Sequence, residues 1–241
     1  MKRIRLTILL SFSLFLSTYS QVDKGFLLGK FDPAMHTAFD SIPDTLADRE
    51  GLFLQREVLL AFVAMRDSAL QDSVHLTIRS AARNFYYQKR IWQAKWNGLR
   101  TVKGLDHCKD NLSEKQKALI ILRYSSMPGS SRHHWGTDID LNDFSNSYFT
   151  YGKGKIEYQW LQANAAKFGF YQPYTKKGTE RSSGYSEEKW HWSYFPLSNT
   201  YLESFQELVK IKDIRGFYGA ATAKEIDIIN KYVFGVAKSP K

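Results

Sequence analysis

Residues 131–140 read SRHHWGTDID and carry the most informative pattern in this chain of 241 residues. His133 and Asp140 offer a nitrogen and a carboxylate oxygen, which zinc accepts as ligands when they lie within about 4 Å of one another. In a straight strand the seven positions that separate them would span roughly 23 Å. The chain must therefore bend, and Gly136 tolerates the backbone conformation that a bend needs.

A second segment, residues 187–192, reads EEKWHW and offers groups of the same kind. Glu188 and His191 come close if the chain turns there, whereas in a flat strand they point to opposite faces. Either segment alone is equally typical of a packed histidine or a solvated strand edge. Together they supply two histidines, a ligating aspartate and a spare glutamate for general base catalysis.

Cysteine usage narrows the kinds of site that are possible. Cys108 is the only cysteine, so the chain forms no internal disulfide and holds no cysteine-rich zinc site. A metal would have to be bound by histidines and carboxylates.

Expected helices and strands do not alternate regularly, which favours an α+β fold over a doubly wound one. Ser113 and Gln116 form a capping-box pattern, and Gly169 is the expected end of a helix. Hydrophobic spacing predicts helices over residues 49–70, 84–97, 113–123, 156–168, 201–211 and 223–233. Alternating or aromatic-rich segments predict strands over residues 74–80, 137–141 and 190–195, the last ended by Pro196, with a loop over 171–186.

The first twenty residues read MKRIRLTILLSFSLFLSTYS, with a basic head, an apolar run and a small-residue exit. These are the three regions of a secretory signal peptide, and the apolar run is shorter than the about 20 residues of a membrane span. We expect cleavage near residues 20–21, export to the periplasm or medium without a stable membrane anchor, and a single mature domain over residues 21–241.

Net charge is +10, and removal of the basic head leaves 31 basic and 24 acidic residues. This moderate excess suits a polyanionic neighbour such as a cell wall. No basic repeat or nucleic-acid-binding pattern accompanies the charge, so no nucleic-acid partner is expected. The oligomeric state is left open.

The two segments resemble the S-x-H-x-x-G-x-A-x-D and E-x-W-H motifs of the zinc D-alanyl-D-alanine carboxypeptidase family, which includes VanY-type enzymes and L,D-carboxypeptidases of peptidoglycan. Residues 80–88, SAARNFYYQ, resemble the family's S-G-Y-R-S-x-x-x-Q stretch, and Gly184 and Tyr185 also look familial. The resemblance covers about residues 50–200. It implies an α+β domain in which helices flank a small antiparallel sheet, with a zinc site in a cleft on the sheet.

The resemblance also implies roles for individual residues. His133, Asp140 and His191 fall on the three zinc ligands, and Glu188 falls on the catalytic base. His134, next to a ligand position, is expected to point elsewhere.

Three further positions are implied to act on substrate. Arg83 falls on the arginine that binds substrate near the scissile bond, while Ser131 and Gln88 fall on positions of substrate contact. Two departures from the family pattern alter the pocket wall beside Arg83: residues 81–82 are both alanine in place of glycine and an aromatic residue, and Asn84 replaces a hydroxyl residue. Asp138 also replaces a small residue. Asp138 either contacts a ligand histidine or points to solvent.

We therefore expect a secreted zinc carboxypeptidase that hydrolyses the terminal D-amino-acid bond of peptidoglycan stem peptides. The alternatives are a murein endopeptidase with the same zinc site and a non-catalytic zinc domain that binds wall peptides. Glu188 favours an enzyme, because a pure binder has no use for a base beside the metal. The choice between a D,D and an L,D bond depends on pocket shape and is left open.

Overall fold

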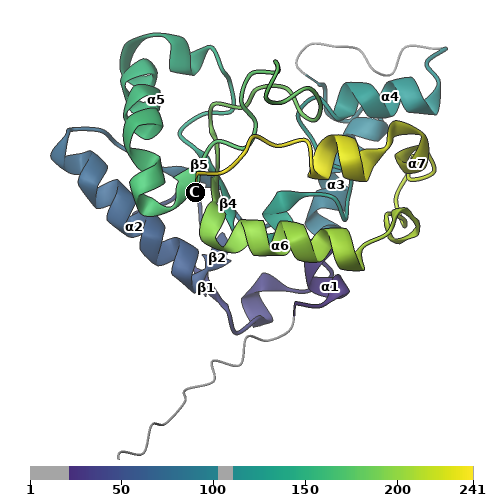
Figure 1. Ribbon diagram of the computed structural model, residues 1–241, viewed down its shortest axis with the longest axis horizontal. Coiled ribbons are helices and arrows are strands. Elements are labelled where there is room, and N and C mark those ends of the chain that lie inside the picture. Colours follow the sequence, from purple (N-terminus) through teal and green to yellow (C-terminus); the bar gives the residue numbers. More distant parts are fainter. Residues whose placement is uncertain (1–21, 103–110, 241) are drawn as a thin grey trace, which may run out of the picture.

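The computed structural model describes residues 22–102 and 111–240, and a four-stranded antiparallel sheet lies at its centre (Figure 1). In spatial order its strands are β3 (Ile78–Ser80), β4 (Asp138–Leu141), β6 (His191–Tyr194) and β5 (Phe170–Tyr171). A separate antiparallel pair joins β1 (Phe39–Ser41) to β2 (Phe53–Gln55). The expected α+β fold with a small antiparallel sheet is confirmed.

The two faces of the four-stranded sheet carry different kinds of side chain, because successive residues of a strand point to opposite faces. Ile139 of β4 and Trp192 of β6 lie in an apolar core on one face. Asp138, Asp140 and His191 therefore belong to the other face. Asp140 pairs directly with His191 across the β4–β6 ladder, so the strand register alone brings these two side chains together.

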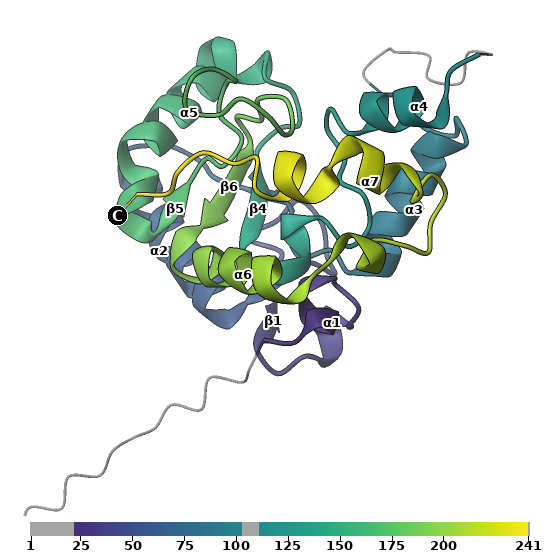
Figure 2. The ribbon, with the colours of Figure 1, turned by 45° about the vertical axis from the view of Figure 1, so that its right-hand side comes forward.

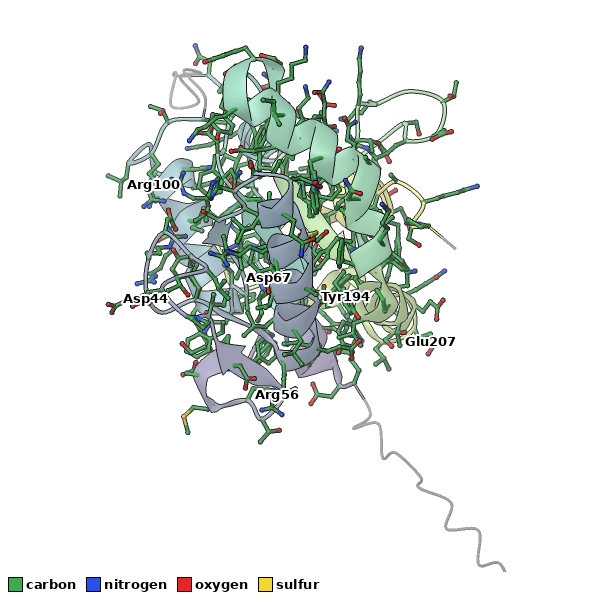
Figure 3. The ribbon with its side chains drawn as sticks, turned by 90° about the vertical axis from the view of Figure 1, so that its left-hand side faces the viewer. Asp44, Arg56, Asp67, Arg100, Tyr194 and Glu207 are labelled. Carbon is green, nitrogen blue, oxygen red and sulfur yellow. The ribbon has the colours of Figure 1, made fainter. Side chains whose placement is uncertain are left out.

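The helices α2 (Arg56–Gln71) and α5 (Gly152–Asn164) cover the apolar face, as Figure 3 shows from the α2 side. Phe62 and Met65 of α2 and Leu161 of α5 are fully buried in the core that they share with the sheet. Burial of such side chains stabilises the fold by about 1.5–3 kcal/mol each. Tyr194, labelled in Figure 3, ties β6 to α2 by donating a hydrogen bond of 2.9 Å to a carboxylate of that helix.

A second apolar core lies among the remaining helices, and Figure 2 shows α3, α4 and α7 on the side of the molecule away from α5. The helices are α1 (Lys24–Leu27), α3 (Phe85–Trp96), α4 (Glu114–Ile121), α6 (Phe195–Leu208) and α7 (Thr222–Ile226). Trp92 of α3, Ile121 of α4 and Phe205 of α6 pack there with Trp135. The sheet thus lies between two packed cores, and Asp138, Asp140 and His191 are on the face opposite the first core.

Short helical turns connect these elements. Five are 3-10 helices and the last is a π-helix: η1 (Pro33–Met35), η2 (Arg132–Trp135), η3 (Tyr148–Thr150), η4 (Ala165–Phe168), η5 (Ile211–Asp213) and η6 (Ile229–Val233).

Several predicted elements agree with the structure. The predicted helix over 84–97 is α3, and the helix predicted from the capping box is α4, in which Ser113 and Gln116 make both hydrogen bonds of the motif. Gly169 ends the predicted helix over 156–168 with φ 82°, although α5 begins earlier, at Gly152. Strand β4 matches the segment predicted over 137–141.

Other predicted boundaries are wrong. The segment 49–70 starts with a loop and β2 before α2, and the ladder of the strand predicted over 74–80 forms only at Ile78–Ser80. The strand predicted over 190–195 is β6, which is shorter at both ends, and Pro196 lies in the first turn of α6 directly after it, where its missing N–H costs no helix hydrogen bond. The predicted helix over 223–233 is broken at Asp227, which has φ 58°.

The expected signal peptide (residues 1–20) and Cys108 lie outside the described residues. Among the residues that are described, no helix combines the length and apolarity needed to cross a membrane.

Candidate functional site

Three side chains on the polar face of the sheet form a group that can hold a metal ion. His133 comes from η2, Asp140 from β4 and His191 from the first position of β6, and their ligand-capable atoms all lie within 4.8 Å of one another. Nε2 of His133 is 3.3 Å from Oδ2 of Asp140, and Nδ1 of His191 is 3.2 Å from Oδ1 of Asp140. All three side chains are buried.

Gly136 provides the bend that brings His133 back to Asp140. It ends η2 in the left-handed region, with φ 67°. A Cβ atom at this position would lie 2.2 Å from Cε1 of Phe39. Both the backbone conformation and the close approach of Phe39 therefore require glycine.

Hydrogen bonds fix which ring nitrogen of each histidine faces the site. Nδ1 of His133 donates to the carbonyl oxygen of Ala81 at 2.8 Å, and Nε2 of His191 lies 2.8 Å from Oδ2 of Asp138. Nε2 of His133 and Oδ1 of Asp140 are buried without a hydrogen-bond partner. Such orphaned atoms fit a metal ion, since a cation satisfies an imidazole lone pair and a carboxylate oxygen together.

Glu188 lies beside this group, in the loop between β5 and β6. Its Oε2 is 3.4 Å from Nδ1 of His191, and its side chain is buried. The loop holds it in place: its N–H donates to the carbonyl of Tyr174 at 2.9 Å, and its own carbonyl accepts from Gln172 at 3.1 Å. The neighbouring Glu187 is only partly buried and is not among the residues that line the cavity over the site.

Burial and neighbouring charges shift the pKa values of the side chains in this site. Burial lowers the pKa of His133, and the charge of Arg83 adds to this effect. Burial also disfavours the charged form of His191, but the three carboxylates around its ring, those of Asp138, Asp140 and Glu188, outweigh it and raise the His191 pKa well above its ordinary value. Burial raises the pKa of Glu188, which holds a proton more readily than an exposed glutamate does.

Arg83 lies at the edge of the same site. Its Nη2 is 3.9 Å from Oδ2 of Asp140, and its backbone N–H donates to the carbonyl of His133 at 3.0 Å. His134 points away from the metal group, as expected: Nδ1 contacts the carbonyl of Arg83 and Nε2 accepts from the N–H of Gly129 at 3.0 Å. His134 thus anchors the segment that carries Arg83.

Gln88 and Ser131, for which the resemblance implies substrate contact, are both buried. Gln88 is almost fully buried, and its amide donates to the carbonyl of Ser126 at 2.8 Å. Ser131 is equally buried, and its Oγ has no hydrogen-bond partner. Neither residue is among those that line the cavity, so Gln88 supports its wall through Ser126, which does line it.

A cavity of about 390 Å³ lies over the metal-capable group. Tyr174 and Tyr185 line it, and two cations from the α3 side, Lys95 and Arg100, join Arg83 there (Arg100 is labelled in Figure 3). Burial, reinforced by the charge of Arg83, lowers the pKa of Lys95 to about 8. Lys95 and Arg100 were not predicted from the sequence, because nothing in the local pattern of α3 and the residues after it separates them from ordinary surface cations.

Comparisons with known proteins agree with this geometry. The sequence model of the VanY family, described as D-alanyl-D-alanine carboxypeptidase, matches residues 51–197. A D-alanyl-D-alanine carboxypeptidase of Enterococcus faecalis (strain ATCC 700802 / V583) is 27% identical over 128 residues, which make up 53% of this chain and 43% of that protein. The putative carboxypeptidase YodJ of Bacillus subtilis (strain 168) is 27% identical over 145 residues, or 59% of this chain and 46% of that protein. The matches thus span less than half the length of these two relatives.

Two solved structures share the fold. A structure of VanYB in complex with D-alanine-D-alanine has a TM-score of 0.51 at 24% identity, covering 73% of this chain and 87% of that one. The structure of the LdcB LD-carboxypeptidase has a TM-score of 0.52 at 20% identity, covering 87% of this chain and 81% of that one.

Proposed function

Because the chain belongs to the VanY family of D-alanyl-D-alanine carboxypeptidases, we propose that it is a secreted zinc carboxypeptidase acting on the terminal D-amino-acid bond of peptidoglycan stem peptides. One observation carries the proposal. His133, Asp140 and His191 converge within 4.8 Å, and the buried carboxylate of Glu188 lies 3.4 Å from His191 in the same cavity.

Zinc is the proposed metal because two imidazole nitrogens and one carboxylate oxygen are a ligand set of catalytic zinc sites. His133 would bind through Nε2, His191 through Nδ1, and Asp140 through its carboxylate. When bound, zinc supplies Lewis acidity and lowers the pKa of a coordinated water. Each histidine has its other ring nitrogen hydrogen-bonded, an arrangement that orients metal ligands.

Glu188 is the proposed general base and acid. It accepts a proton from the attacking water and passes that proton to the leaving amine. Its raised pKa suits both steps, because proton transfer is most efficient when the pKa of the group lies near the working pH. Glu187 has no part in this step, since it does not line the cavity.

Arg83 is proposed to contact the substrate, either at the developing oxyanion or at the terminal carboxylate. Lys95 and Arg100 line the cavity with it, and a wall of three cations suits a substrate that ends in a free carboxylate. This charge favours a carboxypeptidase over a murein endopeptidase, whose substrate continues beyond the scissile bond. Comparing one peptide with a free C-terminus and the same peptide with an amidated C-terminus distinguishes the two roles of Arg83. Recognition of the terminal carboxylate requires the free C-terminus, whereas stabilisation of the oxyanion does not.

Export is part of the proposal, since the substrate lies outside the cytoplasm. It rests on the three-part pattern of residues 1–20. Intact-mass measurement of protein recovered from the periplasm or medium tests it. A mass that includes residues 1–20 would contradict cleavage.

Digestion of purified muropeptides tests the function as a whole. Zinc-loaded protein is incubated with stem peptides that end in D,D and in L,D bonds, and the products are identified by mass spectrometry. Loss of one terminal D-amino acid supports the proposal and identifies the preferred bond. Cleavage only within cross-linked peptides would favour the endopeptidase, and binding without cleavage would favour the non-catalytic domain.

A further inference from the structure

We propose that Asp138 is a positioning residue of the metal site, which orients His191 by means of a buried charged network completed by Arg132. The inference rests on the proposed function, because it concerns how one zinc ligand is held. It assigns a role to a residue that stands where the family motif has a small one.

The contact between Asp138 and His191 determines which nitrogen of the His191 ring carries a proton. Oδ2 of Asp138 is 2.8 Å from Nε2 of His191. An ionised carboxylate only accepts hydrogen bonds, so Nε2 must carry a proton. Nδ1 is then the ring atom left for a metal, and it is this atom that lies 3.2 Å from Asp140.

Arg132 and two hydroxyl groups hold the Asp138 carboxylate rigidly. Nε of Arg132 is 3.0 Å from Oδ2 of Asp138, and both side chains are buried. The other oxygen, Oδ1, accepts from Thr137 at 2.8 Å and from Ser193 at 2.7 Å. Both carboxylate oxygens are therefore engaged, and of these three partners only Arg132 binds Oδ2, the oxygen that faces His191.

The register of the sheet explains why this network reaches the metal site. Asp138 pairs with Ser193 and Asp140 pairs with His191, so the network lies one step along the β4–β6 ladder from the metal-capable group. All four side chains share one face of the sheet because they lie at alternate positions of their strands.

A purely structural role explains the network less well. A buried ion pair often contributes little to stability, because the cost of removing two charges from water offsets their attraction. A small residue at position 138, as in the family motif, would avoid that cost. Orienting His191 requires a hydrogen-bond acceptor at this place, and Asp138 supplies it. The ring of His133 is instead held by the backbone carbonyl of Ala81 and needs no such residue.

Zinc affinity tests the inference without relying on turnover. The zinc dissociation constant is measured by competition with a chromophoric chelator for wild type, Asp138→Asn and Ser193→Ala. Loss of a residue that orients a ligand weakens metal binding about 10–100-fold, and we expect this for Asp138→Asn but a change below about threefold for Ser193→Ala. Ser193→Ala is the matched control, because of the two Asp138 oxygens Ser193 contacts only the one that faces away from His191, and Thr137 and Arg132 still hold the carboxylate in that variant.

The absorption spectrum of the cobalt-substituted protein gives a second readout. A reoriented His191 changes the ligand field, so the visible bands should shift in Asp138→Asn and stay unchanged in Ser193→Ala. A merely structural role would lower the melting temperature and leave both the affinity and the spectrum of the folded protein intact.

The double variant Arg132→Met/Asp138→Asn keeps the test decisive if Asp138→Asn does not fold, because it leaves no buried charge unpaired. We expect the double variant to fold and to lose zinc affinity like the single one. Affinity and spectrum equal to those of Ser193→Ala would overturn the inference. If wild-type protein binds no zinc, the proposed function fails and this inference fails with it; zinc binding by wild type with no effect at position 138 overturns the inference alone.

Discussion

Replacement of Glu188 by glutamine isolates its role as a base. The side chain is 6% exposed and its Oε2 lies 3.4 Å from Nδ1 of His191, so it sits beside the metal group without being one of the three ligands. Glutamine keeps the size and one oxygen but cannot take up the proton of the attacking water. General base catalysis contributes about 10²–10⁴-fold, or about 3–5 kcal/mol of the barrier. We expect kcat to fall by that factor while zinc content stays unchanged.

Stability should not fall with activity in this variant. Burial raises the pKa of Glu188, so the ionised carboxylate is less favourable in the folded than in the unfolded protein at neutral pH. The neutral amide removes this unfavourable contribution, and the melting temperature at pH 7 should be equal or higher.

The assay is release of D-alanine from a D-Ala-terminated peptide, at matched zinc occupancy, for wild type, Glu188→Gln and Glu187→Gln. Glu187→Gln is the control, because it changes an adjacent carboxylate that does not line the cavity. We expect it to retain wild-type turnover. Equal activity of Glu188→Gln and wild type would refute the base assignment, and loss of zinc from Glu188→Gln would show that the residue acts as a ligand instead.

Three further predictions follow from the site. His191→Ala should lower the zinc content below one per chain, since it removes one of three ligands; unchanged stoichiometry by metal analysis would contradict the ligand set. Arg83→Lys keeps the charge but loses the planar fork, so kcat/KM should fall about tenfold or more if Arg83 binds a carboxylate bidentately, and near-native kinetics would rule out that clamp. Burial lowers the pKa of His134 to about 3 in the folded protein. The unfolded chain takes up a proton at this residue below about pH 6.5, where the folded protein does not. The free energy of unfolding therefore falls as the pH drops below about 6.5, by up to about 1.4 kcal/mol per pH unit. Denaturant titrations between pH 7 and pH 4.5 should show a shallower loss in His134→Gln, and an equal slope in both proteins would contradict this account.

Short-range sequence patterns predicted much of the fold. The capping box of α4, the hydrophobic spacing of α3 and the glycine that ends the turn after α5 are local signals, and each is where it was expected. The errors lie where tertiary contacts decide. Residues 53–55 have the composition of the following helix, but they pair with β1 and become a strand. Asp227 interrupts an apolar pattern that read as one continuous helix.

The sequence predicted which residues form the candidate site, but not the contacts that Asp138 makes with its neighbours. Spacing required a bend between His133 and Asp140, and Gly136 provides it. The position of Asp138 relative to His191 depends on strand register, which is set by pairing between segments about fifty residues apart. The partnership of Asp138 with Arg132 could not be predicted for a related reason: Arg132 reads as a surface cation in the sequence and becomes buried only because η2 packs against the sheet and α6.

The most direct test of the central claim uses one peptide that ends in D-Ala-D-Ala with a free carboxylate. Protein stripped with a chelator and protein reloaded with zinc are incubated with it, and the products are separated and weighed by mass spectrometry. The account predicts that the reloaded protein releases the terminal D-alanine and that the stripped protein leaves the peptide intact. Failure of the reloaded, folded protein to cleave either this peptide or its L,D counterpart, or equal cleavage by the stripped protein, would contradict it.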